Sequence, residues 1–199
     1  MRKLISQKDE IPSYIPHDAR FIVLGTMCAL NARTINGEKP DGDFFYYNDN
    51  RNHFWKIMQY LYLPDQEPKR LTIAEKKAFL RDHGIGIQNL VSEIWTPNQS
   101  KLDPSDTVLF DCQKKKKISF KLLTPKVKKS FENATFLFTC RHKKGIENLM
   151  KGFIEANNLS FDLLENIHFL KTPTRCNPYK RSVEWREEIN DFLKSRGRS

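Results

Sequence analysis

The sequence predicts an α/β domain with three layers, in which helices cover both faces of a short, mainly parallel sheet. Phe21–Thr26 (FIVLGT) is a short apolar run that ends in Gly-Thr, which is typical of a fully buried parallel strand. Ala134–Cys140 and Ile167–Thr172 are two later runs of the same kind. Segments with helical spacing alternate with these runs, and such alternation favours a parallel sheet.

Four segments carry apolar residues at helical spacing and are predicted to be helices: 52–63, 72–83, about 144–156 and 184–194. In the second of them Thr72 is the expected N-cap and Glu75 completes a capping box. Ile85–Val91 is apolar and fits either a strand or a turn into a helix. Thr107–Phe110 (TVLF) is predicted to be a strand, and the polar stretch Asn31–Asp43 is predicted to be a loop.

Length and composition indicate one domain over residues 1–199, with 1–19 as an N-terminal extension. A hydrophobic content of 39% allows a packed core. The N-terminus lacks the apolar centre of a signal peptide, and no stretch is long enough for a membrane span, so we expect a cytoplasmic monomer. The four cysteines are far apart and form no CxxC, which predicts free thiols and neither a metal nor another cofactor.

The chain is basic, with 34 Lys and Arg against 24 Asp and Glu and a formal charge of +10. Such a charge on a small domain indicates a polyanionic partner, most simply nucleic acid, although a generally basic surface would give the same count. The run Lys114–Lys117 fits a solvated segment better than a specific DNA contact.

Polar residues follow the predicted strands at the points where the strands end. Because parallel strands present their carboxyl ends at one edge of a sheet, these residues should gather at a single mouth. The residues are Thr26, Arg141, His142, Thr172, Thr174, Arg175 and Asn177.

One segment carries a family resemblance. Phe44–Trp55 (FFYYNDNRNHFW) contains two tyrosines, an Arg-Asn pair and a Phe-Trp pair just before a predicted helix. It resembles the hypoxanthine-DNA glycosylase branch of the uracil-DNA glycosylase superfamily. Gly84–Val91 resembles the GIGxxDVV segment of that branch, and Thr172–Pro178 occupies the position of its second conserved loop.

The resemblance implies an enzyme that flips a deaminated base, hypoxanthine or uracil, out of damaged or mismatched duplex DNA or out of single strands, and hydrolyses its bond to deoxyribose. It implies a catalytic amide at Asn52, for which capping of the following helix is the structural alternative. Phe54 and Trp55 are expected in the core. The expected base-binding pocket consists of Gly25, Thr26, Phe45, Tyr46, Tyr47 and His142.

The second conserved loop and its neighbours are expected to contact DNA, with an ordinary Pro-rich surface loop as the alternative. The expected DNA-binding residues are Arg51, Thr172, Thr174, Arg175, Asn177, Lys180 and Arg181. Arg51 fits a phosphate or a nearby carboxylate equally well. Three loops differ from the family pattern, and the first of them contains Asp41 and Asp43, either of which could activate water. A non-catalytic DNA- or nucleotide-binding protein with the same fold is the alternative function.

Overall fold

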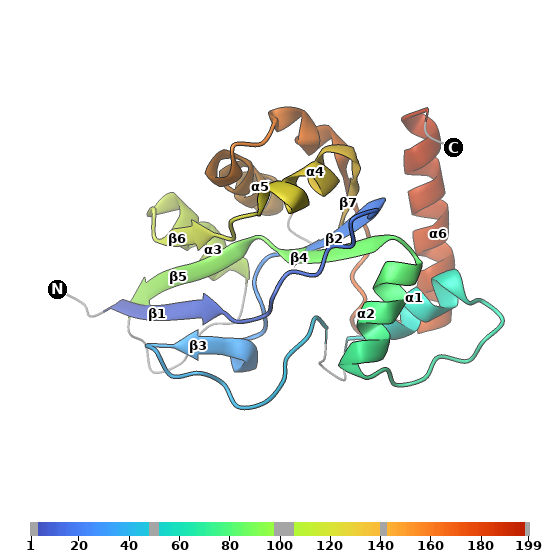
Figure 1. The fold of residues 1–199 in the computed structure, drawn as a ribbon, viewed down its shortest axis with the longest axis horizontal. Coiled ribbons are helices and arrows are strands. Elements are labelled where there is room, and N and C mark those ends of the chain that lie inside the picture. The colour runs from blue at the N-terminus through green and yellow to red at the C-terminus, as the bar shows by residue number, and fades with distance from the viewer. Residues whose placement is uncertain (1–3, 48–51, 98–105, 140–142, 198–199) are drawn as a thin grey trace.

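The computed structural model describes residues 4–47, 52–97, 106–139 and 143–197. Its centre is a four-stranded parallel sheet (Figure 1). The strands lie side by side in the order β4 (Ile85–Asn89), β2 (Phe21–Gly25), β7 (Thr135–Phe138) and β8 (Ile167–Phe169). The three predicted parallel strands are thereby confirmed, and Ile85–Val91 supplies a fourth strand rather than a turn into a helix.

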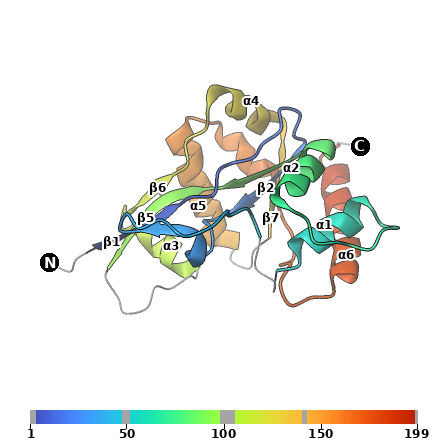
Figure 2. The same ribbon diagram turned by 60° about the horizontal axis from the view of Figure 1, so that its bottom comes forward.

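Helices pack on both faces of this sheet, so the three-layer prediction is confirmed (Figure 2). The first layer consists of α1 (Phe54–Tyr62), α2 (Ile73–Asp82) and α6 (Pro178–Ser195). The second consists of α3 (Asp106–Lys114), α4 (Pro125–Asn133) and α5 (Lys143–Asn157). Successive side chains of β2 point to opposite faces of the sheet. Val23 therefore packs against the first helical layer, whereas Ile22 and Leu24 pack against the second.

A second, antiparallel sheet extends the molecule beyond the parallel one. Its order is β3 (Arg33–Ile35), β1 (Leu4–Asp9), β5 (Val91–Pro97) and β6 (Ile118–Phe120). Only Leu90 separates β4 from β5, so the chain passes directly from one sheet into the other. The segment expected as an N-terminal extension therefore contributes a central strand, and the stretch expected as a loop contributes an edge strand and a short 3₁₀ helix, Leu30–Ala32.

The structure corrects one predicted strand. Thr107–Phe110 belongs to helix α3, in which Leu109 and Cys112 are buried at helical spacing. The capping box of α2 is confirmed: Thr72 Oγ1 accepts from the Glu75 backbone N–H at 3.2 Å, and Glu75 Oε2 accepts from the Thr72 N–H at 2.8 Å. Within the described part of the chain, no helix is long and apolar enough to cross a membrane.

Candidate functional site

A cleft of about 1000 Å³ opens at the carboxyl ends of β2 and β7. It brings together eight of the predicted site residues: Gly25, Thr26, Phe45, Tyr46, Tyr47, Asn52, Thr174 and Arg175. Thr172, Asn177, Lys180 and Arg181 do not line it. Arg51, Arg141 and His142 lie outside the described residues, so their predicted roles stay predictions.

The floor of the cleft is formed by Gly25 and Asn89, which are paired residues at the ends of β2 and β4. An added Cβ at Gly25 would lie 2.2 Å from Asn89 Oδ1, so only glycine leaves room for this carboxamide. Asn89 is 3% exposed and was not predicted as a site residue. It lies within Gly84–Val91, the second segment of the family resemblance, and its pairing with Gly25 across the sheet brings it into the site.

Beneath the floor lies a buried carboxylate, Asp9, at the end of β1. Its side chain is inaccessible to solvent. Oδ2 accepts from Asn89 Nδ2 and from the Cys28 backbone N–H, both at 2.7 Å. Oδ1 accepts from the Ile11 N–H at 2.9 Å and from Lys121 Nζ at 3.1 Å. Four donors, one of them charged, satisfy the carboxylate, as a buried charge requires.

Tyr47 supplies the accessible aromatic wall. Its ring stacks on Phe54 at 4.2 Å between centroids, and its hydroxyl lies 3.5 Å from Thr139 Oγ1. Its φ of 55° places it in the left-handed region, which is rare for an aromatic residue. Phe45 and Tyr46 are 2% and 3% exposed, so they support the wall from the core. Half-buried Phe44, which was not predicted, also lines the cleft.

Two ionisable groups at the cleft are held in their neutral forms. Burial raises the pKa of the Tyr46 phenol well above its usual range, and the negative charge of Asp9 raises it further. Burial likewise raises the pKa of the Cys28 thiol to about 12, with Asp9 adding to the effect. Neither group is suited to act as a nucleophile near neutral pH.

Asn52 lies directly before α1, where the chain is tied to a distant loop. Its Oδ1 accepts from the Phe54 backbone N–H at 3.0 Å, so its side chain does satisfy a donor at the start of the helix. Its backbone forms an isolated antiparallel bridge with Thr174, and the His53 N–H donates to the Pro173 carbonyl at 3.0 Å. Among the described residues no acceptor is recorded for Asn52 Nδ2, and Asn52 lines the cleft. Phe54 and Trp55 are core residues, as predicted.

Among the described residues, two carboxylates line the cleft. Asp106, the first residue of α3, accepts from Thr26 Oγ1 at 2.7 Å and was not predicted as a site residue. Asp43 also lines the cleft, whereas Asp41 does not. The described part of the chain contains no group of three or more His, Cys, Asp or Glu residues that could hold a metal ion.

The loop before α6 is held by its own side chains. Thr172 and Thr174 share a hydroxyl contact at 3.0 Å, and Arg181 Nη1 donates to the Thr172 carbonyl at 2.6 Å. Arg181 also forms an ion pair with Glu184. Asn177 Oδ1 accepts from the Lys180 N–H and caps α6. These contacts give the polar residues internal roles, and their predicted DNA contacts stay predictions.

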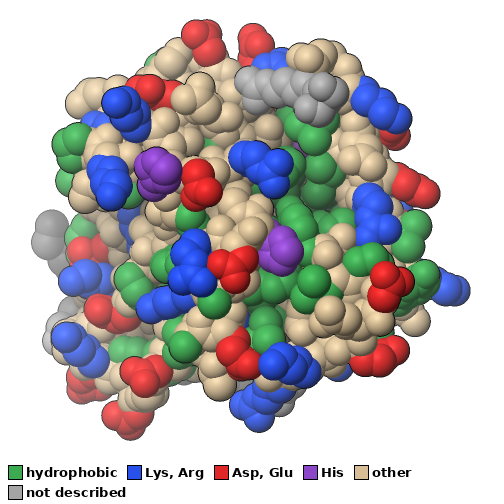
Figure 3. Space-filling model, turned by 45° about the vertical axis from the view of Figure 1, so that its right-hand side comes forward, with side chains coloured by type: hydrophobic (Ala, Val, Ile, Leu, Met, Phe, Trp, Pro, Cys, Tyr) green, Lys and Arg blue, Asp and Glu red, His purple; other side chains and the backbone are tan. Residues whose placement is uncertain are grey.

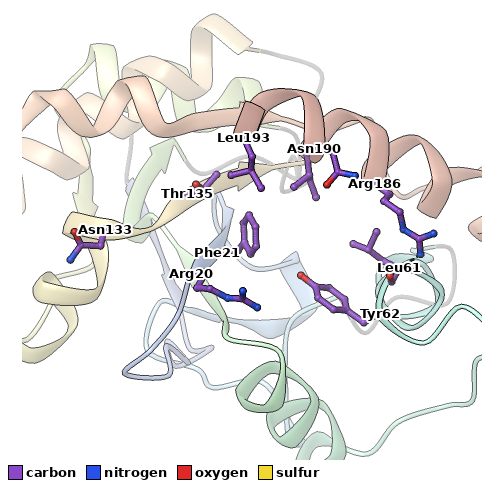
Figure 4. Close-up of a pocket in the computed structure, with 10 residues that line it drawn as sticks. Arg20, Phe21, Leu61, Tyr62, Asn133, Thr135, Arg186, Asn190 and Leu193 are labelled. Atoms are coloured by element: carbon purple, nitrogen blue, oxygen red, sulfur yellow. Dashed lines mark hydrogen bonds between the residues drawn. The ribbon is translucent and has the colours of Figure 1, made fainter. Parts of the chain in front are cut away.

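A second pocket, of about 440 Å³, lies at the opposite ends of the strands, between α1 and α6. In Figure 4, Phe21 and Leu193 face its interior, while Arg20 and Arg186 lie toward its edges. Figure 3 shows the corresponding side of the molecule, where hydrophobic side chains line a hollow with basic side chains near it. The described residues that line this pocket include none of the predicted site residues and no carboxylate.

The comparisons with known proteins agree with this three-layer α/β class. No protein-family model matches the sequence, and no curated protein does. Among solved structures, the chain is similar to the solution NMR structure of a candidate uracil DNA glycosylase from Methanosarcina acetivorans. The TM-score is 0.51 at 12% sequence identity, over 92% of this chain and 99% of that one. The chain therefore has a uracil-DNA glycosylase-like fold.

Proposed function

We propose that this protein is a DNA glycosylase that hydrolytically removes a deaminated base, hypoxanthine or uracil, from DNA. The observation that carries the proposal is one cleft that combines an accessible aromatic face at Tyr47, a buried amide acceptor at Asn89 and an amide donor at Asn52. The glycosylase-like fold of the structural neighbour supports the same class of reaction.

The three groups match the three requirements of base excision. A flipped base needs a flat surface for stacking, and Tyr47 provides one that is braced by Phe54. The edge of the base needs a hydrogen-bonding partner, and Asn89 Oδ1 at the cleft floor is an acceptor. The reacting sugar needs a polar group that positions water, and Asn52 Nδ2 can hold the oxygen of a water molecule.

The proposed reaction cleaves the bond between C1′ and the base nitrogen, and the electron pair of this bond leaves with the base. Water adds its oxygen to C1′ and releases one proton, and the departing base takes up one proton, so that the overall reaction balances. A fixed donor near the base would stabilise the charge on the departing base by on the order of 3 kcal/mol in a site that excludes water. Asp106 or Asp43 can accept the proton from water, since both carboxylates line the cleft.

DNA is the proposed partner because the chain carries a formal charge of +10 and a basic residue, Arg175, at the cleft. Counterion release makes such binding dependent on salt. Lys180 and Arg51 are proposed to add phosphate contacts. We further propose that the protein acts in the cytoplasm and as a monomer.

The test is a base-excision assay on duplex and single-stranded oligonucleotides that contain one inosine or one uracil. Abasic product is detected by alkaline strand cleavage. We expect product from at least one of the two bases and its loss in an Asn52→Ala variant. Absence of product for both bases would overturn the proposal.

A second candidate function is supported by the contact between Asn52 Oδ1 and the Phe54 N–H, which gives Asn52 a structural role without catalysis. The protein would then bind DNA or nucleotides without cleaving them. This alternative predicts DNA binding that depends on salt and is nearly unchanged in Asn52→Ala, with no abasic product.

A further inference from the structure

We propose that Asp9 is a specificity-determining residue: it fixes the orientation of the Asn89 carboxamide so that the cleft accepts bases with an N–H at the edge that meets Asn89. The inference rests on the proposed function and assigns a role to a strand outside the parallel sheet. Asp9 touches no base itself, so it acts by positioning Asn89.

The first step is the position of Asn89. Its carboxamide is buried between Asp9 on one side and Gly25 on the other. Nδ2 donates to Asp9 Oδ2 at 2.7 Å, and Oδ1 lies over Gly25, where an added Cβ would come within 2.2 Å of it. The amide therefore has one end in the protein interior and the other end at the floor of the cleft.

The second step is the orientation of the amide. A carboxylate that forms an ion pair with Lys121 can only accept hydrogen bonds, and every group around Asp9 is a donor. Turning the Asn89 amide by 180° would place its oxygen against the carboxylate and its NH₂ toward Gly25. Two oxygens facing each other without a proton in a buried site are strongly unfavourable. Asp9 thus allows a single orientation, with an acceptor at the floor.

The third step is the chemistry of the bases. Hypoxanthine and uracil carry an N–H on the ring nitrogen of the pairing edge, whereas adenine and cytosine carry a lone pair there. An acceptor at a fixed position pairs with the N–H and opposes the lone pair. Leaving a buried acceptor unpaired costs about 1–3 kcal/mol, which corresponds to a discrimination on the order of 10-fold or more.

An Asp9→Asn substitution changes the hydrogen bonding that orients the Asn89 amide but keeps the size of the side chain at position 9. The new amide should place its oxygen toward the Lys121 ammonium and the Ile11 N–H, because its NH₂ would meet two donors there. Its NH₂ then faces Asn89 and the Cys28 N–H, which loses its acceptor, and Asn89 can accept from this NH₂ only by turning its own oxygen inward. The Asn89 NH₂ would then reach the cleft floor. The cleft would therefore prefer a base whose ring nitrogen at this edge carries a lone pair over one whose ring nitrogen carries an N–H.

The experiment measures the affinity of duplexes that contain one 2′-fluoroarabino nucleotide, whose sugar resists cleavage. The paired probes are hypoxanthine and unsubstituted purine, which has a lone pair at the same nitrogen and no exocyclic amine. We expect wild type to prefer hypoxanthine by about 10-fold or more, and Asp9→Asn to lose or invert that preference. An unchanged preference in Asp9→Asn would overturn the inference.

The matched control is Lys121→Met, which disturbs the same buried carboxylate but leaves its contact with Asn89. It should lower stability and keep the preference for hypoxanthine. A loss of preference in this variant as large as that in Asp9→Asn would show that general loosening is the cause and would contradict the inference. If wild type excises inosine while Asp9→Asn keeps the preference, the inference fails and the proposed function stands. Wild type that distinguishes neither probe from undamaged duplex would contradict both.

A measurement on the wild-type protein keeps the inference testable if Asp9→Asn does not fold. In solution NMR, the Asn89 NH₂ protons should show a nuclear Overhauser effect to the Cys28 amide proton, since both groups donate to Asp9 Oδ2. Effects to the Gly25 α-protons in place of those to Cys28 would mean the reverse orientation and would overturn the inference.

Discussion

Asn52 and Thr174 form an antiparallel backbone bridge that joins the two loops preceding α1 and α6. The donation from the His53 N–H to the Pro173 carbonyl strengthens the same junction. Both helices therefore begin at the cleft, and the Phe54 and Trp185 rings contact each other just behind it, 6.1 Å apart. The backbone contacts of Asn52 and His53 with the loop before α6 thus position the amide that is proposed for catalysis.

The first prediction concerns Asn52→Ala. It should reduce base excision by about 100-fold or more if the amide positions water. It should also cost about 1 kcal/mol of unfolding free energy, because the Phe54 N–H loses its acceptor. Thr72→Ala is the matched control, since it removes the cap of α2 at a similar cost to stability and leaves activity intact. Excision rates and urea unfolding separate the two effects. An equal loss of activity in both variants would indicate a structural role only.

The second prediction concerns Gly25→Ala. The added Cβ meets Asn89 Oδ1, so the amide must move and its contact with Asp9 weakens. We expect a loss of about 2 kcal/mol in stability and a strong loss of excision. Gly86→Ala is the control from the neighbouring strand β4, where a Cβ would lie 3.2 Å from Ile15 and Ile22. Thermal unfolding and activity should show a smaller effect there. Equal effects in the two variants would argue against a role for the floor.

Local patterns explain which parts of the fold the sequence predicts. The capping box of α2 involves neighbours three residues apart, so it is readable from Thr72 and Glu75 alone. Strand β1 is not readable in this way. Its inward residues are Ile5, Gln7 and Asp9, and two polar residues out of three hide the period of two. Their burial depends on partners far along the chain, which no local pattern reveals.

The residues of the candidate site likewise fall into those that a local pattern predicts and those that it does not. The strand-end rule places Thr26 and Thr174 at one mouth, and the structure brings both to the cleft. Asn89 and Asp106 were missed, because one depends on pairing between β2 and β4 and the other on a helix predicted as a strand. A run as short as Thr107–Phe110, with three apolar residues, fits either a strand or a helix, and only the longer segment Asp106–Lys114 decides between them.

The third prediction concerns Arg175, a cleft residue with a φ of 51°. Arg175→Gly keeps this backbone conformation accessible and removes the charge. If Arg175 contacts a phosphate, DNA affinity should fall for all sequences, and the slope of log K against log salt should decrease in magnitude by about 0.9 for duplex DNA. Arg81→Ala, at the far end of the molecule on α2, is the control and should leave the slope unchanged. Fluorescence anisotropy over a salt series measures both, and an unchanged slope in Arg175→Gly would exclude the phosphate contact.

The fourth prediction concerns stability at mildly acidic pH. Burial lowers the pKa of His168, the Lys143 ammonium lowers it further, and Nε2 is buried without a hydrogen-bond partner among the described residues. The unfolded chain then binds more protons than the folded one below about pH 6.5, so unfolding free energy falls as the pH falls from there toward the lowered pKa. The pKa of His83 is also lowered by burial, so His83 changes the stability in the same direction.

His168→Phe keeps a ring against Phe192, 4.8 Å away in the native protein, and removes the titrating group. Urea unfolding at pH 7.5 and pH 5.5 should show a smaller loss of stability in this variant than in wild type. An equal or larger loss would mean that His168 takes up its proton as readily in the folded protein as in the unfolded chain.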